Sequence, residues 1–69
     1  MKYKVDEWVI YRPFADAESE LLREMQNRAL ILWVYPKSDF YDYDIYIEDT
    51  GKKKKVRELH LFPERPPTY

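Results

Sequence analysis

A chain of 69 residues with a net charge of −1 suits one small domain and lacks the basic excess of a dedicated nucleic-acid binder. It has no cysteine, which excludes disulfides and cysteine-based zinc sites as sources of stability. A domain of this size buries only about 60% of its unfolded surface. The aromatic residues, 17% of the chain, must therefore supply much of the core.

Residues 4–12 are predicted to form the first strand. Val9 and Tyr11 share one side of an alternating pattern that is typical of a half-buried strand. Asp6 interrupts the run together with the glutamate that follows it, which indicates a tight bend. Pro13 ends the strand because proline cannot donate a ladder hydrogen bond.

Residues 16–28 are the expected helix, inserted after the first strand. Asp16 is the predicted N-cap, and acidic residues in the first turn favour the helix dipole. Leu21, Leu22 and Met25 form a narrow apolar stripe at helical spacing. About three turns are marginal in isolation, so we expect this helix to dock on the sheet.

Residues 29–35 are apolar on both sides of a strand pattern. Such a run favours a strand that is covered on both faces, with the helix on one of them. Trp33 is accordingly expected in the core, together with Tyr11 and Tyr43. The turn that follows, residues 36–39, is predicted from its composition.

Residues 41–57 are predicted to form a β-hairpin with an acidic first arm and a basic second arm. Residues 41–48 alternate cleanly, and Gly51 can take the positive φ that a tight turn requires. The preferred register pairs apolar with apolar and acid with base: Ile45–Val56, Glu48–Lys53 and Asp44–Arg57. A glycine bulge would flip the last strand by one residue.

Residues 58–63 are too rich in large apolar side chains to continue the alternation. They predict a tight turn that places Leu59 or Leu61 under the sheet. Residues 1–63 are therefore expected to form the domain, and residues 64–69 a mobile, proline-rich tail. The tail ends in Pro-Pro-Thr-Tyr, which matches the short signature of WW-domain ligands.

Three stretches follow a recognisable pattern: YKVDEWVIY at residues 3–11, YDYDIYIED at 41–49, and VRE at 56–58 with Leu61 and Pro63 after it. Together they resemble the small SH3-like barrels of the KOW and tudor type. Asp6 stands where that family usually has glycine, and residues 13–28 are a long insertion. The resemblance implies a non-catalytic adaptor that binds protein or nucleic acid. Short stand-alone versions occur in phages and mobile elements.

The expected fold is mainly β with one helix (α+β), in the order β-α-β-β-β. It is either a small SH3-like barrel or a strongly bent antiparallel sheet. The aromatic set is too large to be buried in full, and surplus aromatic surface is typical of an interface. We therefore expect binding to a protein partner or to a second copy. The candidate contact residues are Trp8, Tyr11, Phe40, Tyr41 and Tyr46.

An alternative is a nucleic-acid interface made by Lys52, Lys53, Lys55 and Arg57 with aromatic stacking. Pairing of the lysines with the acidic arm argues against it, and edge lysines also prevent aggregation. A minority alternative is an acidic mimic of nucleic acid, built on the aspartates and glutamate of residues 39–49.

No enzyme, metal or cofactor is expected. His60 is the only histidine and has no partner motif, and the single glycine cannot form a phosphate-binding loop. Asp42 and Asp44 lack the longer ligand series of a calcium loop. The charged N-terminal residues do not resemble a signal peptide, and the longest apolar run is far shorter than the roughly 20 residues that cross a bilayer. We expect a cytoplasmic protein, or a virion-associated one if a phage encodes it.

Overall fold

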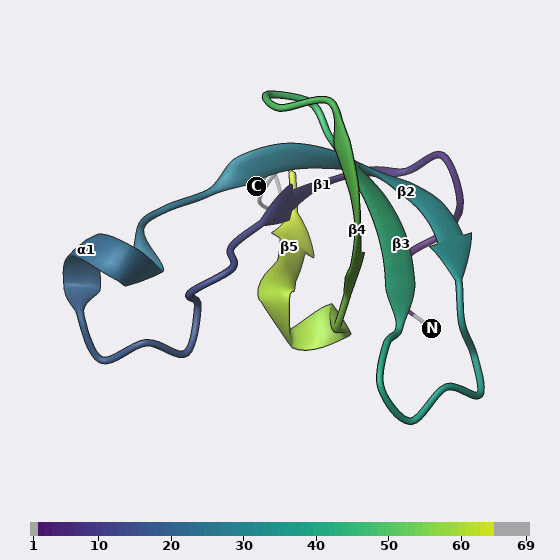
Figure 1. Cartoon of the computed structure of the whole chain (residues 1–69), viewed down its shortest axis with the longest axis horizontal. Coiled ribbons are helices and arrows are strands. Elements are labelled where there is room, and N and C mark those ends of the chain that lie inside the picture. The colour runs from purple at the N-terminus through teal and green to yellow at the C-terminus, as the bar shows by residue number, and fades with distance from the viewer. Residues whose placement is uncertain (1, 65–69) are drawn as a thin grey trace, which may run out of the picture.

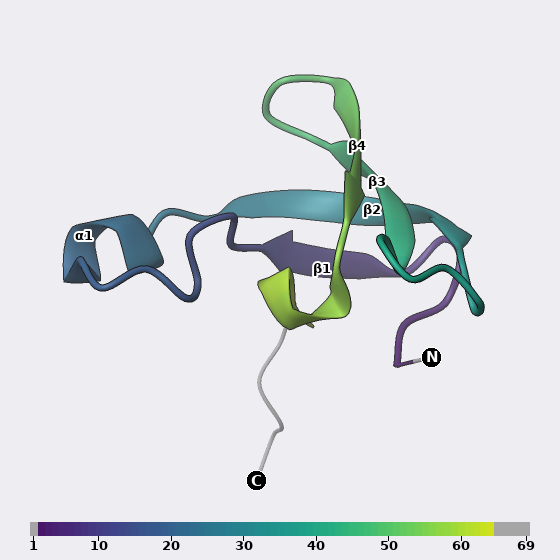
Figure 2. The same ribbon diagram turned by 60° about the horizontal axis from the view of Figure 1, so that its bottom comes forward.

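A computed structural model describes residues 2–64 and contains one bent, five-stranded antiparallel sheet and one small helix (Figure 1). The elements are β1 (Trp8–Tyr11), α1 (Glu20–Arg23), β2 (Asn27–Val34), β3 (Tyr43–Ile47), β4 (Lys52–Val56), the 3-10 turn η1 (Glu58–His60) and β5 (Leu61–Pro63). The strand order is β4-β3-β2-β1-β5, so β4 and β5 are the two edges and the sheet is not closed. The hairpin of β3 and β4 stands away from the layer formed by β1 and β2 (Figure 2). None of the described helices is long and apolar enough to cross a membrane.

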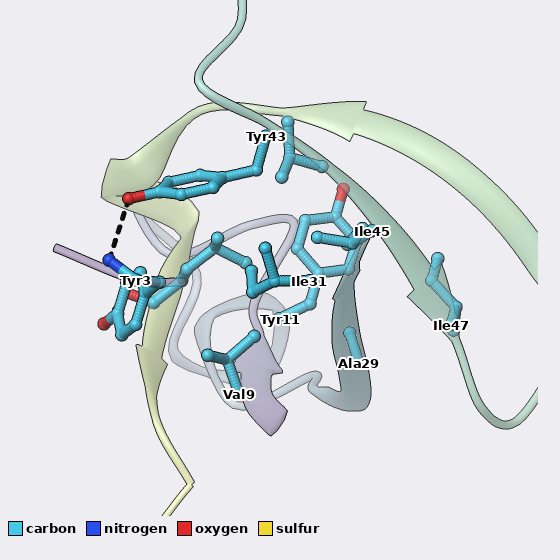
Figure 3. Close-up of a cluster of buried hydrophobic side chains, with 10 residues drawn as sticks. Tyr3, Val9, Tyr11, Ala29, Ile31, Tyr43, Ile45 and Ile47 are labelled. Carbon is cyan, nitrogen blue, oxygen red and sulfur yellow. Dashed lines mark hydrogen bonds between the residues drawn. The ribbon is translucent and has the colours of Figure 1, made fainter. Parts of the chain in front are cut away.

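One face of the sheet carries the core. Alternate residues of β1 and β3 are buried, which confirms the predicted period of two. Tyr11 and Tyr43 are buried as predicted. Figure 3 shows the cluster, whose members come from all five strands and from the segment before β1. They are Tyr3, Val9, Tyr11, Ala29, Ile31, Tyr43, Ile45, Ile47, Val56 and Leu61.

A tyrosine–glutamate network closes the core beside η1. The Tyr43 hydroxyl donates to Glu58 Oε1 at 2.5 Å and accepts from the backbone N–H of Tyr3 at 3.1 Å (Figure 3). The backbone N–H of Lys2 also donates to Glu58, at 3.0 Å. The hydrogen bond from Tyr43, followed by that from Lys2, lowers the pKa of Glu58. Burial and the Glu58 hydrogen bond raise the pKa of Tyr43 to about 12.

Acid should weaken this network. The pKa of Glu58 is lower in the folded state, so its ionised form stabilises the fold above the unfolded pKa, and this contribution is lost as the pH falls through the lowered pKa. We expect Glu58→Gln to flatten the loss of stability below about pH 4.3. Urea unfolding across pH 3–7 measures this, with Glu18→Gln, an exposed glutamate outside the sheet, as control. Parallel acid limbs for wild type and Glu58→Gln would contradict the assignment.

The predicted bend at Asp6 is confirmed. Asp6 has a φ of 71°, and the N–H of Glu7 donates to the carbonyl of Lys4 at 3.1 Å. Asp6 itself donates to the carbonyl of Ile31 at 2.8 Å, which ties the bend to β2. Regular pairing consequently begins at Trp8, four residues later than predicted.

Asp6 occupies a conformation that suits glycine, and aspartate tolerates it better than most residues. We expect Asp6→Gly to change the free energy of unfolding by less than about 0.5 kcal/mol, since relief of strain offsets the extra freedom of the unfolded chain. Asp6→Val should cost about 1–2 kcal/mol because a β-branched side chain clashes at positive φ. Urea unfolding of both variants tests the bend; a Val variant as stable as wild type would contradict it.

The predicted helix over residues 16–28 is wrong in length and in packing. Only Glu20–Arg23 is α-helical, and Ser19, not Asp16, is its N-cap. No residue of α1 is buried, and Leu21 is 80% exposed. Leu21, Leu22 and Met25 of the apolar stripe are all exposed, so burial of this stripe does not stabilise further turns. Asn27 and Arg28 instead pair with β1.

The prediction that residues 29–35 form a strand covered on both faces is wrong, because one face of β2 is not covered. Its register shifts by one residue between Ile31 and Trp33, so Leu32 is an extra residue opposite β3. Such a bulge changes which side chains point to each face. Trp33 consequently lies opposite Asp44 on the outward face, and Val34 packs against the core in its place. The expectation that Trp33 is a core residue is therefore wrong.

The predicted hairpin forms, but its register is shifted by two residues. Tyr43 lies opposite Val56 and Asp44 opposite Lys55, in place of the predicted Ile45–Val56 and Asp44–Arg57 pairs. The loop holds four residues, and Gly51 has the expected positive φ of 68°. A shift of two keeps every side chain on its predicted face, because the side-chain period of a strand is two.

The chain after β4 forms the predicted tight turn. η1 turns the chain and Leu61 enters the core, whereas Leu59 remains exposed. Residues 61–63 also add the short strand β5 beside β1, which the prediction lacked. Residues 65–69, with the Pro-Pro-Thr-Tyr motif, lie outside the described part of the chain.

Candidate binding surface

The outward face of the sheet, opposite the core, carries a row of large side chains. The register places Trp8 opposite Leu30, Leu30 opposite Tyr46, and Tyr46 opposite Lys53, so the row crosses four strands. These three apolar residues are half-buried by lateral neighbours. Figure 2 shows α1 beyond the end of the sheet rather than on this face. We call Trp8, Leu30, Trp33 and Tyr46 the outward aromatic face.

Trp33 is the most accessible part of this face. Its side chain is 59% exposed although it belongs to a strand. The loop that follows β2 adds Phe40, which is 74% exposed, and Tyr41, which is also exposed. The N–H of Tyr35 donates to the carbonyl of Asp42 at 2.8 Å and closes this loop at the end of the β2–β3 ladder. Exposed aromatics thus gather at one end of the sheet.

Arg28 orders the opposite end of the face. Its guanidinium lies 3.9 Å from the centre of the Trp8 ring, a distance suited to a cation–π interaction. The same group donates to Glu48 at 2.7 Å and to Glu64 at 3.0 Å. The hydrogen bonds to Glu64 and Glu48 raise the pKa of Arg28. Trp8 is therefore held in one orientation, and two carboxylates share the charge of Arg28 beside it.

A second polar cluster lies beside Trp33. The Tyr35 hydroxyl donates to Asp44 at 2.6 Å, and Lys55 donates to that hydroxyl at 3.0 Å and to Asp44 at 3.2 Å. Burial alone would raise the pKa of Asp44, but the hydrogen bonds from Tyr35 and Lys55 outweigh it and the pKa is lowered. The hydrogen bonds to Tyr35 and Asp44 raise the pKa of Lys55. This cluster fixes the charge at the rim of the aromatic face.

The predicted cancellation of charge within the hairpin is only partly correct. Lys55 pairs with Asp44, but Glu48 pairs with Arg28 and not with Lys53. Within residues 2–64, no carboxylate oxygen lies within 4.0 Å of the ammonium groups of Lys52, Lys53 or Lys54. Lys54 instead reaches over the ring of Tyr11, at 5.5 Å from its centre. The register shift is the cause, since it places Tyr46 and not Glu48 opposite Lys53.

The structure separates the predicted contact residues. Trp8 and Tyr46 lie in the outward row, and Phe40 and Tyr41 lie in the adjoining loop. Tyr11 is 4% exposed and belongs to the core, so its predicted place at a binding rim is wrong. The sequence prediction missed Trp33 and Leu30. Both residues could have been found from the apolar character of both sides of β2, but the prediction explained that character by a helix docked on one face.

Other candidate chemistry is sparse. Among the residues that the structure describes, no three histidine, aspartate or glutamate side chains are grouped so that they could hold a metal ion. His60 is half-buried, and its Nε2 lies 3.6 Å from Asp16. The hollow beside the outward row is lined by Glu7, Trp8, Arg28, Pro63 and Glu64. It therefore combines one aromatic surface with charges of both signs.

Protein YorP from Bacillus subtilis, whose structure was determined by NMR, has a similar fold. The two match with a TM-score of 0.70 and 23% sequence identity, over 96% of this chain and 74% of YorP. No protein family and no curated protein sequence matches the chain. The chain is therefore a small β-rich domain with a structural neighbour in YorP, and the likeness extends to the fold alone.

Proposed function

We propose that this protein is a non-catalytic binding module that contacts a protein partner through the outward aromatic face. The observation that carries the proposal is Trp33, a large apolar side chain that is 59% exposed on a strand. It adjoins a continuous row of half-buried apolar residues that α1 does not cover. Contiguous apolar surface of this kind marks interaction sites, and tryptophan and tyrosine dominate binding energy at such sites.

The charges around this face favour a protein over a polyanion. At one end Arg28 is paired with two glutamates, and at the other Lys55 is paired with Asp44. Both ends thus offer acids and bases in fixed positions. A rim of mixed charge with an aromatic centre is the usual composition of a protein–protein interface.

The proposed fold family is the small SH3-like barrel. Three features support it: the sheet is strongly bent, η1 separates the last two strands, and β5 pairs with β1 so that the end of the chain returns to its beginning. Members of that family act as adaptors.

Affinity capture with matched variants tests the proposal. Trp33→Lys should lose the protein partners that the wild type retains, with an affinity loss of at least roughly tenfold for a central aromatic contact. The control is Leu21→Lys, because Leu21 is even more exposed but lies on α1, away from the sheet. Circular dichroism verifies that both variants fold. Equal retention of every partner by wild type and Trp33→Lys would overturn the proposal.

Nucleic-acid binding through the lysine run is the second candidate. It is favoured by the three lysines that have no carboxylate nearby in the described part of the chain. Single-stranded nucleic acid binds such a strand through phosphate contacts and aromatic stacking, and its affinity falls steeply with salt. Retention on a single-stranded DNA or RNA column at low salt, lost as salt rises, would support this function. An absence of retention would eliminate it.

A further inference from the structure

β4 ends the sheet and presents an open edge. The strand order stops at β4, and beyond Val56 the chain turns into η1. In Figure 2 the half of β4 next to the hairpin loop stands, together with β3, away from β1 and β2. Apart from the ladder to β3, the described backbone hydrogen bonds of this strand include only one from Asp42 to the Val56 carbonyl. An open edge of this kind displays donors and acceptors that can pair with another strand.

The edge is cationic on both faces of the sheet. Lys52, Lys53, Lys54 and Lys55 are all exposed, and successive side chains of a strand point to opposite faces. The register places Lys53 and Lys55 on the outward face, and Lys52 and Lys54 on the core side. Of the four, Lys55 alone has a carboxylate within 4.0 Å among residues 2–64. The other three are available for new ion pairs.

Two features decide what can occupy this edge. A second copy of the same strand would bring four more lysines against these four, and like charges directly opposite each other destabilise a pair. A nucleic acid would neutralise the lysines but would leave the strand's backbone groups without partners. An extended acidic peptide meets both requirements of the edge. Its amides complete a ladder with the backbone of β4, and its carboxylates neutralise the lysines.

We propose that the outer edge of β4 binds an extended acidic segment of a partner protein as a sixth strand of the sheet. Carboxylates of that segment pair with Lys52, Lys53 and Lys54. An apolar residue near its end lies beside Val56. The lysines select against self-pairing and against neutral strands, and the backbone ladder selects against polyanions that are not polypeptides. This site is separate from the outward aromatic face and does not depend on it.

A capped peptide of glutamate and threonine with a valine near one end tests the proposal. It should bind the whole chain with an affinity that falls with salt, and it should slow amide hydrogen exchange in Lys52–Val56. The same peptide N-methylated at alternate amides keeps its charge but cannot complete the ladder. Loss of one or two hydrogen bonds should weaken its binding by roughly tenfold. A single-stranded oligonucleotide tests whether a polyanion without a peptide backbone binds equally well.

Variants of the protein locate the site. Lys53→Glu combined with Lys54→Glu should abolish peptide binding, whereas Lys37→Glu, an exposed lysine in the loop before β3, should leave it unchanged. Urea unfolding verifies that the variants fold. Equal binding of the two peptides, tighter binding of the oligonucleotide without exchange protection in β4, or no binding of any probe would each overturn the proposal.

Discussion

Replacing Tyr43 with alanine is expected to lower the free energy of unfolding by about 3–5 kcal/mol, which is the usual cost of truncating a buried aromatic. A domain of this length has only about 3–10 kcal/mol in total. Tyr43 is fully buried, it lies opposite Val56, and its ring packs edge-to-face on that of Tyr3 at 5.8 Å. This variant should therefore lose a large fraction of its stability at 25 °C, which circular dichroism and urea unfolding can measure.

The matched variant Tyr43→Phe separates the ring from its hydroxyl. It keeps the packing but removes the bond to Glu58 and leaves the N–H of Tyr3 without its acceptor. An unsatisfied buried donor costs about 1–3 kcal/mol, so this variant should fold with intermediate stability. Two variants of equal stability would show that the hydroxyl network, and not the ring, holds this region. A Tyr43→Ala variant as stable as wild type would contradict the proposed core.

The alternation of β3 made its two faces predictable. Tyr43, Ile45 and Ile47 are buried while the residues between them face outward, as a strand with one covered face requires. Its exact partner was not predictable. Registers that differ by two residues place the same side chains on the same faces, so hydrophobic pattern cannot distinguish them. Charge pairing could not choose between them, because the second arm is basic along its length and either register places Asp44 opposite a base.

Helix propensity alone does not predict the structure of residues 16–28, because their apolar side chains are not buried against the sheet. Residues 16–28 have good helical composition, but a short helix persists only when a neighbouring element buries its apolar side. Leu21 and Met25 are exposed, and the segment extends away from the sheet in Figure 1. The apolar stripe can be recognised in the sequence, but whether another element buries it cannot.

The outward aromatic face could not be predicted in full, because one extra residue in β2 changes the orientation of Trp33. β2 is apolar on both sides, so its pattern does not mark where Leu32 interrupts the ladder. Without the bulge, the orientation of Trp33 cannot be derived, and a buried strand is the simpler interpretation. Trp8 and Tyr46 could be placed outward because their own strands alternate regularly. The candidate site was thus predictable only in its regular strands.

The two proposed sites use different parts of the same small sheet. The outward aromatic face relies on side chains that the core does not need, and the β4 edge relies on backbone groups that the sheet leaves unpaired. Because one layer of strands supplies both the core and these surfaces, most strand residues belong to one of the three. Under the two proposals, this small domain would contact two partners through separate parts of one sheet.

Tyr3 is expected to matter almost as much as Tyr43, although it precedes the first strand. It is 3% exposed, its N–H donates to the Tyr43 hydroxyl, and its own hydroxyl donates to the carbonyl of Leu61 at 3.2 Å. The ring thus joins the beginning of the chain to β3 and to β5. We expect Tyr3→Ala to cost about 3 kcal/mol or more, and Tyr3→Phe about 1 kcal/mol.

Urea unfolding of these two variants tests whether the N-terminal segment is part of the core. The control is Lys4→Ala, since Lys4 is exposed and adjacent in sequence. Surface substitutions of this kind usually change stability by less than about 0.5 kcal/mol. If Tyr3→Ala changed stability no more than Lys4→Ala, the segment would be a dispensable arm. The expected large loss would instead mean that a residue from outside the sheet supplies part of the core. No residue of α1 makes such a contribution.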